Sequence, residues 1–226
     1  MARISRIVVP GIPHHITQRG NRRQLTFLIR DDYKVYLELM AMRCRRFGVE
    51  VWAYCLMPNH VHLIAVPDVG SDLCRAIGEA HQLYTRHINA REGWTGHLWQ
   101  GRFASYPMDE PHLIMAARYI ELNPVRAGLA REPGEYQYSS ARAHLSGCDD
   151  KLVKVKPLLE RIDNWRDFLN ASLPQEVMEQ VRKHERTGRP IGSDEFVDKL
   201  SRIVGRNLRK RKPGPKGPRK LSRVSP

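Results

Sequence analysis

The chain has 226 residues, of which 41% are hydrophobic, and a formal net charge of +14. No run approaches the roughly 20 apolar residues that cross a bilayer, and proline breaks the short apolar run near the N-terminus, so we expect neither a membrane span nor a signal peptide but a cytoplasmic protein. The four cysteines include no CxxC pair, which argues against a zinc ribbon or a disulfide framework.

The first part of the chain predicts a strand, a helix and a hairpin. Residues 11–20 alternate as a strand does, and residues 31–48 have helical spacing with acidic residues first and basic residues last. Two β-rich runs, 49–57 and 60–67, follow with Pro-Asn between them, which is typical of a β-hairpin.

The next elements complete an α+β pattern. Residues 70–93 predict a second helix, 100–108 a further strand, and 109–129 a third helix with an acidic residue and proline at its start. The order β-α-β-β-α-β-α is typical of a ferredoxin-like antiparallel sheet with helices packed on one face, here extended by one more helix. We assign residues 1–148 to this domain.

Beyond the third helix the sequence predicts short helices only, over 164–169, 174–185 and 193–208. We therefore expect an all-helical accessory region at 149–208 and a disordered basic tail at 209–226, where apolar residues are too few to fold. The last two helices could form a helix-turn-helix that reads duplex DNA, or a helical hairpin that caps a core. The sequence leaves both interpretations open.

The positive charge lies at the two ends of the chain. Residues 201–226 contain ten Lys or Arg, residues 1–30 contain six Arg, and neither segment has an acidic residue. Because each phosphate neutralised by a basic side chain releases counterions, this distribution favours a polyanion partner, with nucleic acid first. A tail that only adds solubility is the alternative.

Two histidines interrupt the apolar run at 60–67. Since side chains alternate along a strand, His60 and His62 project from one side, about 7 Å apart at Cα, while Val61 points into the core. Two imidazoles placed in this way can bind one metal ion. A pair of partly exposed surface histidines is the alternative.

Partners for the histidines lie on the predicted third helix. Tyr119 and Asn123 are four residues apart, so they share one helix face. If that face meets the sheet beside the histidines, Asn123 can supply a third ligand while Tyr119 reaches a phosphate bound to the metal. The helix has an apolar set of its own, which argues against Tyr119 as an ordinary packing residue.

Three motifs together resemble a known family. They are "MPNHVHLI" at 57–64, "HLWQGRF" at 97–103 and "ARYIELNPVRAGL" at 117–129. They resemble the single-tyrosine HUH transposases, in particular the REP-associated tyrosine transposases of bacterial genomes, from about Gly11 to Gly147. The resemblance implies a metal-dependent cut of single-stranded DNA that joins the tyrosine to the 5′ phosphate and frees a 3′-OH, so that strands can later be rejoined.

The resemblance also implies roles for the candidate residues. Tyr119 matches the nucleophile, His60 and His62 match the metal ligands, and Asn123 falls where the family places a polar third ligand, often glutamine. The implied ion is Mg²⁺ or Mn²⁺. Asn is one methylene shorter than Gln, so the helix must approach closely or a water must bridge. We assign most of the catalysis to the metal, because phenols are almost wholly protonated at pH 7 and no general base is evident.

Residues suited to DNA gather in "HHITQRGNRR" at 14–23 and among the arginines of the later motifs. The resemblance implies that residues 14–23 help to read a short sequence beside a hairpin. Trp99 either stacks on a base or belongs to the core. The predicted DNA-binding residues are His15, Gln18, Arg19, Asn21, Arg22, Arg102, Arg118 and Arg126.

Three rival functions stay in view: a domesticated, non-catalytic nucleic-acid-binding protein of the same fold, a relaxase of the HUH superfamily, and a metal-dependent hydrolase that forms no adduct. Intact His60, His62 and Tyr119 argue against the binding protein, and the absence of a second tyrosine near Tyr119 argues against the relaxase. The expected partner is single-stranded DNA with hairpins of the REP type, and a monomer is favoured over a homodimer.

Overall fold

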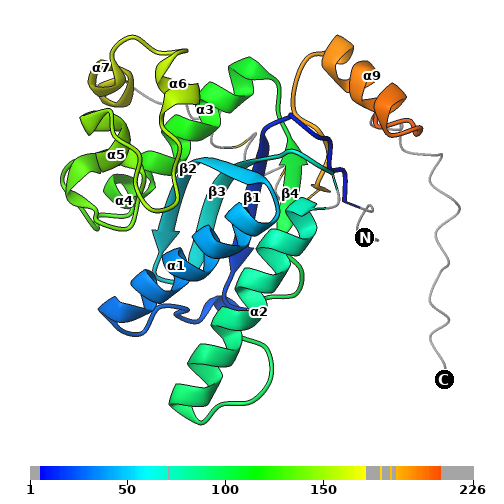
Figure 1. The fold of residues 1–226 in the computed structure, drawn as a ribbon. Helices are drawn as coiled ribbons and strands as arrows, with labels where there is room; N and C mark the ends of the chain where they lie inside the picture. The colour runs from blue at the N-terminus through cyan, green and yellow to red at the C-terminus, as the bar shows by residue number, and fades with distance from the viewer. Residues whose placement is uncertain (1–5, 71, 172–178, 180–183, 185–186, 210–226) are drawn as a thin grey trace, which may run out of the picture.

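A four-stranded antiparallel sheet with the strand order β2-β3-β1-β4 forms the centre of the molecule (Figure 1). The computed structural model describes residues 6–70, 72–171, 179, 184 and 187–209. The strands are β1 (His14–Arg19), β2 (Val49–Met57), β3 (His60–Pro67) and β4 (Ala104–Pro107). The α-helices include α1 (Arg30–Arg46), α2 (Asp72–Glu92), α3 (Glu110–Glu121), α4 (Asn123–Arg126), α5 (Ala141–Ser146), α6 (Lys156–Leu159), α7 (Trp165–Asn170) and α9 (Asp194–Ile203), and 3₁₀ turns lie at Asn21–Arg23 and Pro133–Glu135. The predicted α+β class, the antiparallel sheet and the β2–β3 hairpin are confirmed.

The helices α1 and α2 lie side by side on one face of the sheet (Figure 1). They form one hydrophobic core with strand residues that alternate toward them, including Ile16, Val61 and Leu63, all fully buried. The two helices of the ferredoxin-like pattern therefore share a face, as predicted.

The third helix lies on the other face of the sheet, so the one-face arrangement does not extend to it. α3 packs on β2 and β3, where Ala53, Cys55 and Ile64 point away from α1 and α2. The reason is that the central strands are apolar on both sides, and a sheet of this kind needs cover on both faces.

The predicted helix at 109–129 is divided at Leu122. Pro124 has no N–H and cannot donate to the carbonyl four residues earlier, so α3 ends at Glu121 and the short α4 starts at Asn123. At the other end of α3, the Asp109 side chain accepts a hydrogen bond from the His112 N–H and caps the helix. Leu122 keeps helical backbone angles, so α4 follows α3 closely.

The accessory helices share a core with α3. Leu158, Trp165 and Leu169 lie in the same hydrophobic cluster as Ala117 and Ile120. The predicted boundary after residue 148 therefore falls within one packed cluster rather than between two separate cores.

Several sequence predictions concern the end of the chain. α9 confirms a helix within 193–208, and it packs on the N-terminal residues Ile7 and Val9. Except for Glu179 and His184, the predicted helix at 174–185 lies outside the described residues, as does the tail after Arg209, so the helix-turn-helix interpretation stays a prediction. Within the described residues, no helix is both long and apolar enough to cross a membrane.

Candidate active site

The two histidines of β3 point toward α3. Their ring centroids lie 5.0 Å apart with an interplanar angle of 82°. His62 is buried and His60 is partly exposed, while Val61 between them belongs to the core under α1 and α2. The alternation predicted from the sequence therefore holds, and it separates the two imidazoles from the apolar core.

Tyr119 lies on α3 directly against this histidine pair. Its ring centroid is 5.7 Å from that of His62, and the guanidinium carbon of Arg126 lies 4.5 Å from the centre of the Tyr119 ring. Burial is the largest cause of the lowered pKa of His62, and the nearby charge of Arg126 is the smallest of the causes. A tyrosine, two histidines and a cation thus meet on the face of the sheet that α3 covers.

Asn123 carries a buried polar group without a partner. The residue is only 8% exposed, and its Nδ2 atom makes no hydrogen bond in the structure. Buried amides are nearly always satisfied, so an orphaned one calls for an explanation. A cation would bind the oxygen of this amide and not its NH2 group, so the unpaired Nδ2 does not by itself indicate a metal ion.

The histidines are in the charge state that metal binding needs. Burial, with a smaller contribution from Arg19, lowers the pKa of His60 to about 4, and burial lowers the pKa of His62 well below its usual value. His60 Nδ1 donates a hydrogen bond of 2.6 Å to Asn59 Oδ1, which leaves the lone pair on Nε2. Among the described residues no three His, Cys, Asp or Glu side chains form a metal-binding group.

The comparisons with known proteins agree with this geometry. The family model described as "Transposase IS200 like" matches residues 9–123, which is just over half of the chain. The chain belongs to this transposase family. The matched segment contains both histidines and Tyr119, and it ends at Asn123.

Two relatives of the transposase are more specific. A curated protein of Haemophilus influenzae that is named as a REP-associated tyrosine transposase is 24% identical over 141 residues, which are 54% of this chain and 80% of the relative. A solved REP-associated tyrosine transposase bound to a REP hairpin superposes with a TM-score of 0.57 at 20% identity, covering 69% of this chain and 93% of the other. The second likeness shows a shared fold, and together the comparisons confirm the resemblance carried by the motifs.

His15 of the transposase lies behind His62 rather than at the surface. Its Nε2 atom is 3.0 Å from His62 Nδ1, its Nδ1 atom is 2.5 Å from the Tyr106 hydroxyl, and it has no exposed surface. Burial lowers the pKa of His15 to about 3, so the ring is neutral at pH 7. This placement corrects the prediction that His15 contacts DNA, because a fully buried imidazole cannot reach a strand.

The His15 contacts suit an orienting role instead. If His62 Nδ1–H donates to His15, and His15 Nδ1–H donates in turn to the Tyr106 oxygen, then His62 presents its Nε2 lone pair to the site. Partners of this kind fix the tautomer of a metal-binding histidine. The sequence analysis missed Tyr106, although it is paired with His15 across the strands and therefore shares its face of the sheet.

The other predicted DNA-binding residues divide between two places. Arg19 pairs with His60 across β1 and β3, and Asn21 and Arg22 follow in the 3₁₀ turn, with Arg22 exposed. Gln18 and Arg102 belong to the opposite side of the sheet, where Gln18 donates to the Gly101 carbonyl oxygen.

Arg118 is not at the site. It is 8% exposed, and its guanidinium carbon lies 5.2 Å from the centre of the Phe168 ring in α7. This corrects the prediction that Arg118 binds DNA, because adjacent residues on a helix point in different directions, and only Tyr119 of the two faces the sheet histidines.

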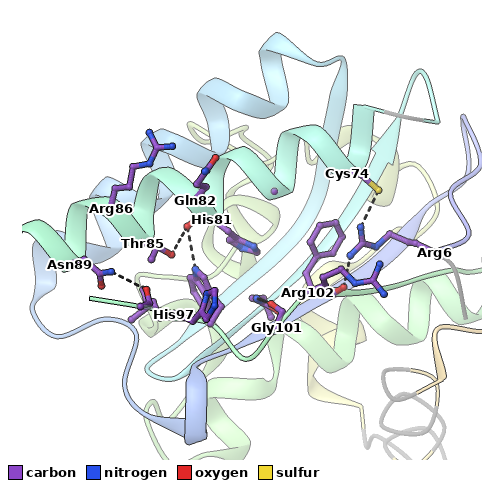
Figure 2. A pocket seen from close by; sticks show the side chains of 16 residues that line it. Arg6, Cys74, His81, Gln82, Thr85, Arg86, Asn89, His97, Gly101 and Arg102 are labelled. Carbon is purple, nitrogen blue, oxygen red and sulfur yellow. Dashed lines mark hydrogen bonds between the residues drawn. The ribbon is translucent and has the colours of Figure 1, made fainter. Parts of the chain in front are cut away.

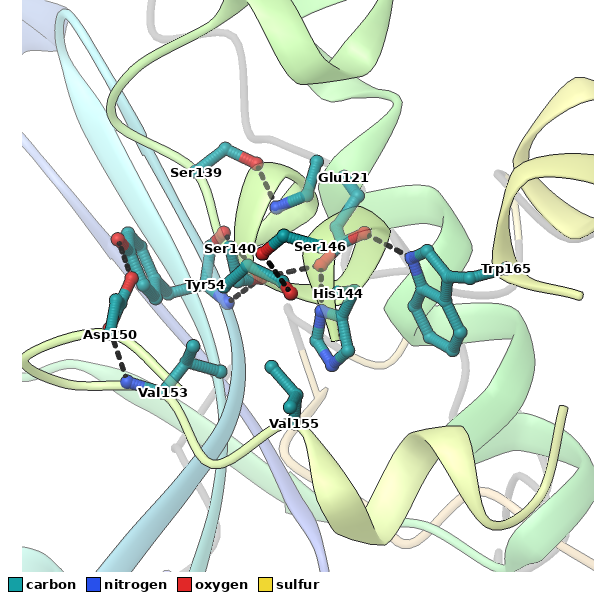
Figure 3. A network of polar contacts seen from close by, with 12 residues as sticks. Tyr54, Glu121, Ser139, Ser140, His144, Ser146, Asp150, Val153, Val155 and Trp165 are labelled. Carbon is teal, nitrogen blue, oxygen red and sulfur yellow. Dashed lines mark hydrogen bonds and ion pairs between the residues drawn. The ribbon is translucent and has the colours of Figure 1, made fainter. Parts of the chain in front are cut away.

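A buried carboxylate holds the tyrosine helix in place. Glu121 is fully buried and accepts hydrogen bonds from Ser140 Oγ at 2.5 Å, His144 Nδ1 at 2.6 Å and Trp165 Nε1 at 2.8 Å (Figure 3). It lies two residues after Tyr119 and two before Asn123, so it ties this part of the chain to α5 and α7. The sequence analysis missed this anchor, and the one signal for it was an acidic residue within an apolar helix.

Proposed function

We propose that this transposase cuts single-stranded DNA by attack of the Tyr119 hydroxyl on a phosphodiester, with Mg²⁺ or Mn²⁺ held by His60, His62 and Asn123. The contact between the Tyr119 ring and His62 carries the proposal, because it places a nucleophile beside two neutral imidazoles. Asn123 is the proposed third ligand because its amide oxygen suits a hard cation, and because among the described residues no third His, Cys, Asp or Glu side chain joins the two histidines.

In the proposed reaction one ester bond replaces another. The Tyr119 oxygen loses its proton and bonds to phosphorus, the bond from phosphorus to the 3′ oxygen breaks, and that oxygen takes up a proton. The products are a 5′-phosphotyrosine and a free 3′-OH. A second 3′-OH can attack the phosphotyrosine and release Tyr119, so strand joining needs no nucleotide cofactor. The bound metal would polarise the phosphate and favour the attack.

Two arginines have supporting roles in this proposal. Arg126 lies over the Tyr119 ring, where its positive charge can stabilise the negative charge that develops on the attacked phosphate. Arg19 is paired with His60 and can neutralise a phosphate that enters beside the histidines. Both residues are supplied by the same chain as the histidines.

The proposed substrate is a DNA hairpin with a single-stranded flank. The solved relative is bound to a REP hairpin, and the basic ends of this chain suit a nucleic-acid partner. A DNA substrate places the protein's action at the nucleoid. The proposed functional unit is a monomer, because Glu121 ties the Tyr119 helix to α5 and α7 of its own chain.

The test is formation of a covalent adduct. The protein is incubated with Mn²⁺ and labelled hairpin DNA that has single-stranded flanks, and the products are separated on a denaturing gel. We expect a protein-sized shift with the wild type and with Tyr138→Phe, a control that removes the hydroxyl of a half-buried tyrosine stacked on Tyr33, but none with Tyr119→Phe. Cleavage without a shift would assign the attack to water, and binding without cleavage would favour a non-catalytic binding protein.

A further inference from the structure

The motif at 97–103 forms a wide bulge beside β1. Thr17 pairs with Ala104, and Gly20 pairs with Trp99. Between these two pairs the chain advances by three residues on the β1 side and by five residues in the neighbouring segment. The two additional residues push this segment out of the sheet ladder, as a β-bulge does. Gly101 stands in the bulge with a φ of +69°, a conformation that glycine adopts without strain.

Side chains brace the bulge on several sides. Gln18 donates a hydrogen bond of 2.9 Å to the Gly101 carbonyl oxygen, and Asn89 donates one of 3.1 Å to that of Gly96. Arg6 donates one of 2.8 Å to the Phe103 carbonyl oxygen and also stacks over the Phe103 ring. The bulge is therefore held in its shape without a ligand.

The bulge and α2 enclose a groove of about 580 Å³ (Figure 2). Its floor is made by the buried rings of His81, Trp99 and Phe103. The amides of Gln82 and Asn89 lie on the α2 side. Basic side chains at its edge are Arg6, Arg86, His97 and Arg102, and none of the described residues that line it is acidic.

We propose that this groove binds one unpaired nucleotide of the DNA substrate, on the face of the sheet opposite Tyr119. The volume is in the range of small-ligand sites, roughly 300–1,000 Å³. Exposed arginines at the edge suit a phosphate, and amide side chains offer both donors and acceptors to the edge of a base. Trp99 belongs to the floor as a buried ring, so it contributes apolar surface rather than an open stacking face.

The groove is continuous with the strand path expected at the active site. Asn21 N donates to the Leu98 carbonyl oxygen at 2.8 Å, and Gln100 N donates to that of Arg19 at 2.8 Å. Arg19 in turn pairs with His60. A DNA strand that leaves the histidines along Arg19 and the following turn thus arrives at the groove, which favours a nucleotide of the same strand over a free nucleotide. This inference rests on the proposed DNA substrate.

Gly78 allows the groove to be filled with little disturbance. It lines the groove from α2, and a Cβ atom added there meets nothing within 4 Å. Gly78→Phe fills the groove, whereas Gly78→Ala changes the helix in the same way and leaves the groove open. Both variants are combined with Tyr119→Phe, so that binding is measured without cleavage.

The experiment measures the affinity of both variants for hairpin DNA in which each flanking nucleotide is replaced in turn by an abasic one. We expect Gly78→Phe, but not Gly78→Ala, to weaken binding about tenfold, the size of losing contact with one base. One abasic position should weaken binding by Gly78→Ala and have no further effect on Gly78→Phe.

Three outcomes would overturn the inference. Equal affinity of the two variants would mean that the groove does not contact DNA. The same abasic profile in both would mean that no base enters it. Binding of thymidine 5′-monophosphate that only Gly78→Phe abolishes, with DNA affinity unchanged, would make it a site for free nucleotides. None of these results depends on adduct formation, so they are distinct from failure of the proposed reaction.

Discussion

The two faces of the sheet differ in what they bury. Toward α1 and α2, the strands present apolar side chains such as Leu63 to a core rich in aromatic rings. Toward α3, the preceding residue of the same strand is His62, which contacts His15 and Tyr119. Because side chains alternate along β3, residues that pack in the core under α1 and α2 lie next to residues that face the candidate active site.

The face toward α3 also buries groups that titrate. Burial holds His15 and His62 neutral, and desolvation of these imidazoles opposes folding whenever they would be charged in the unfolded chain. The apolar face and the Glu121 anchor supply the free energy that offsets this. Substitutions on each face test whether the reaction and the folding stability depend on different sets of residues.

The largest expected effect is that of His62→Ala on adduct formation. Removing this proposed metal ligand should lower the rate about a thousandfold, because metal stabilisation of the phosphate is worth several kcal/mol. Gel quantification of the adduct and Mn²⁺ titration by calorimetry measure the two losses. Activity and Mn²⁺ affinity that both persist in this variant would remove His62 from the metal site.

The second effect concerns the anchor of the tyrosine helix. Glu121→Leu removes the shared acceptor of three buried donors and leaves His144 Nδ1 and Trp165 Nε1 unpaired, whereas Ser140 Oγ can still donate to the Tyr54 carbonyl oxygen; it should lower the free energy of unfolding by about 3–5 kcal/mol. Trp165→Phe removes only one donor and should cost about 1–3 kcal/mol. Urea denaturation of both variants tests this ranking, and an equal or smaller loss for Glu121→Leu would contradict it.

The third effect is the counterpart of the first on the apolar face. Leu63→Ala should lower the free energy of unfolding by about 2–5 kcal/mol, because a fully buried side chain leaves a cavity. At a temperature where circular dichroism shows the variant to be folded, its adduct yield should equal that of the wild type. A yield as low as that of His62→Ala would show that the two faces are not separate.

The smallest effect is a pH dependence of stability. His81 lies on the apolar face, where its Nε2 atom shares a hydrogen bond with the Tyr36 hydroxyl. Burial lowers the pKa of His81 from 6.5 to about 3. Below pH 6.5 the unfolded chain binds protons that the folded protein does not, so the free energy of unfolding falls as the pH drops from 6.5 toward 3.

Each such histidine contributes at most about 1.4 kcal/mol per pH unit. His81→Gln keeps a polar partner for Tyr36 but does not titrate, so its stability should fall less steeply between pH 6.5 and pH 4.5 than that of the wild type. Urea denaturation at several pH values measures the two slopes. Parallel slopes would mean that folding does not lower the pKa of His81.

Local patterns in the sequence predicted the strands, the hairpin and the pairing of His60 with His62, because alternation and helical spacing act over a few residues. They did not predict the face chosen by α3, since spacing shows that a helix has an apolar side but not which side of a sheet it covers. The sequence also did not show which of two adjacent histidines contacts the site. His14 and His15 are both buried, but only His15 contacts His62. The Glu121 partners and the bulge at 97–103 depend on tertiary contacts.

The most direct test of the site is the position of the DNA on the protein after reaction. The adduct formed with Mn²⁺ and a short hairpin substrate is digested with trypsin and nuclease, and the modified peptide is sequenced by mass spectrometry. The account predicts a nucleotide joined to Tyr119. A nucleotide on another residue, such as Tyr106 behind His15, or cleaved DNA with no modified peptide, would contradict it.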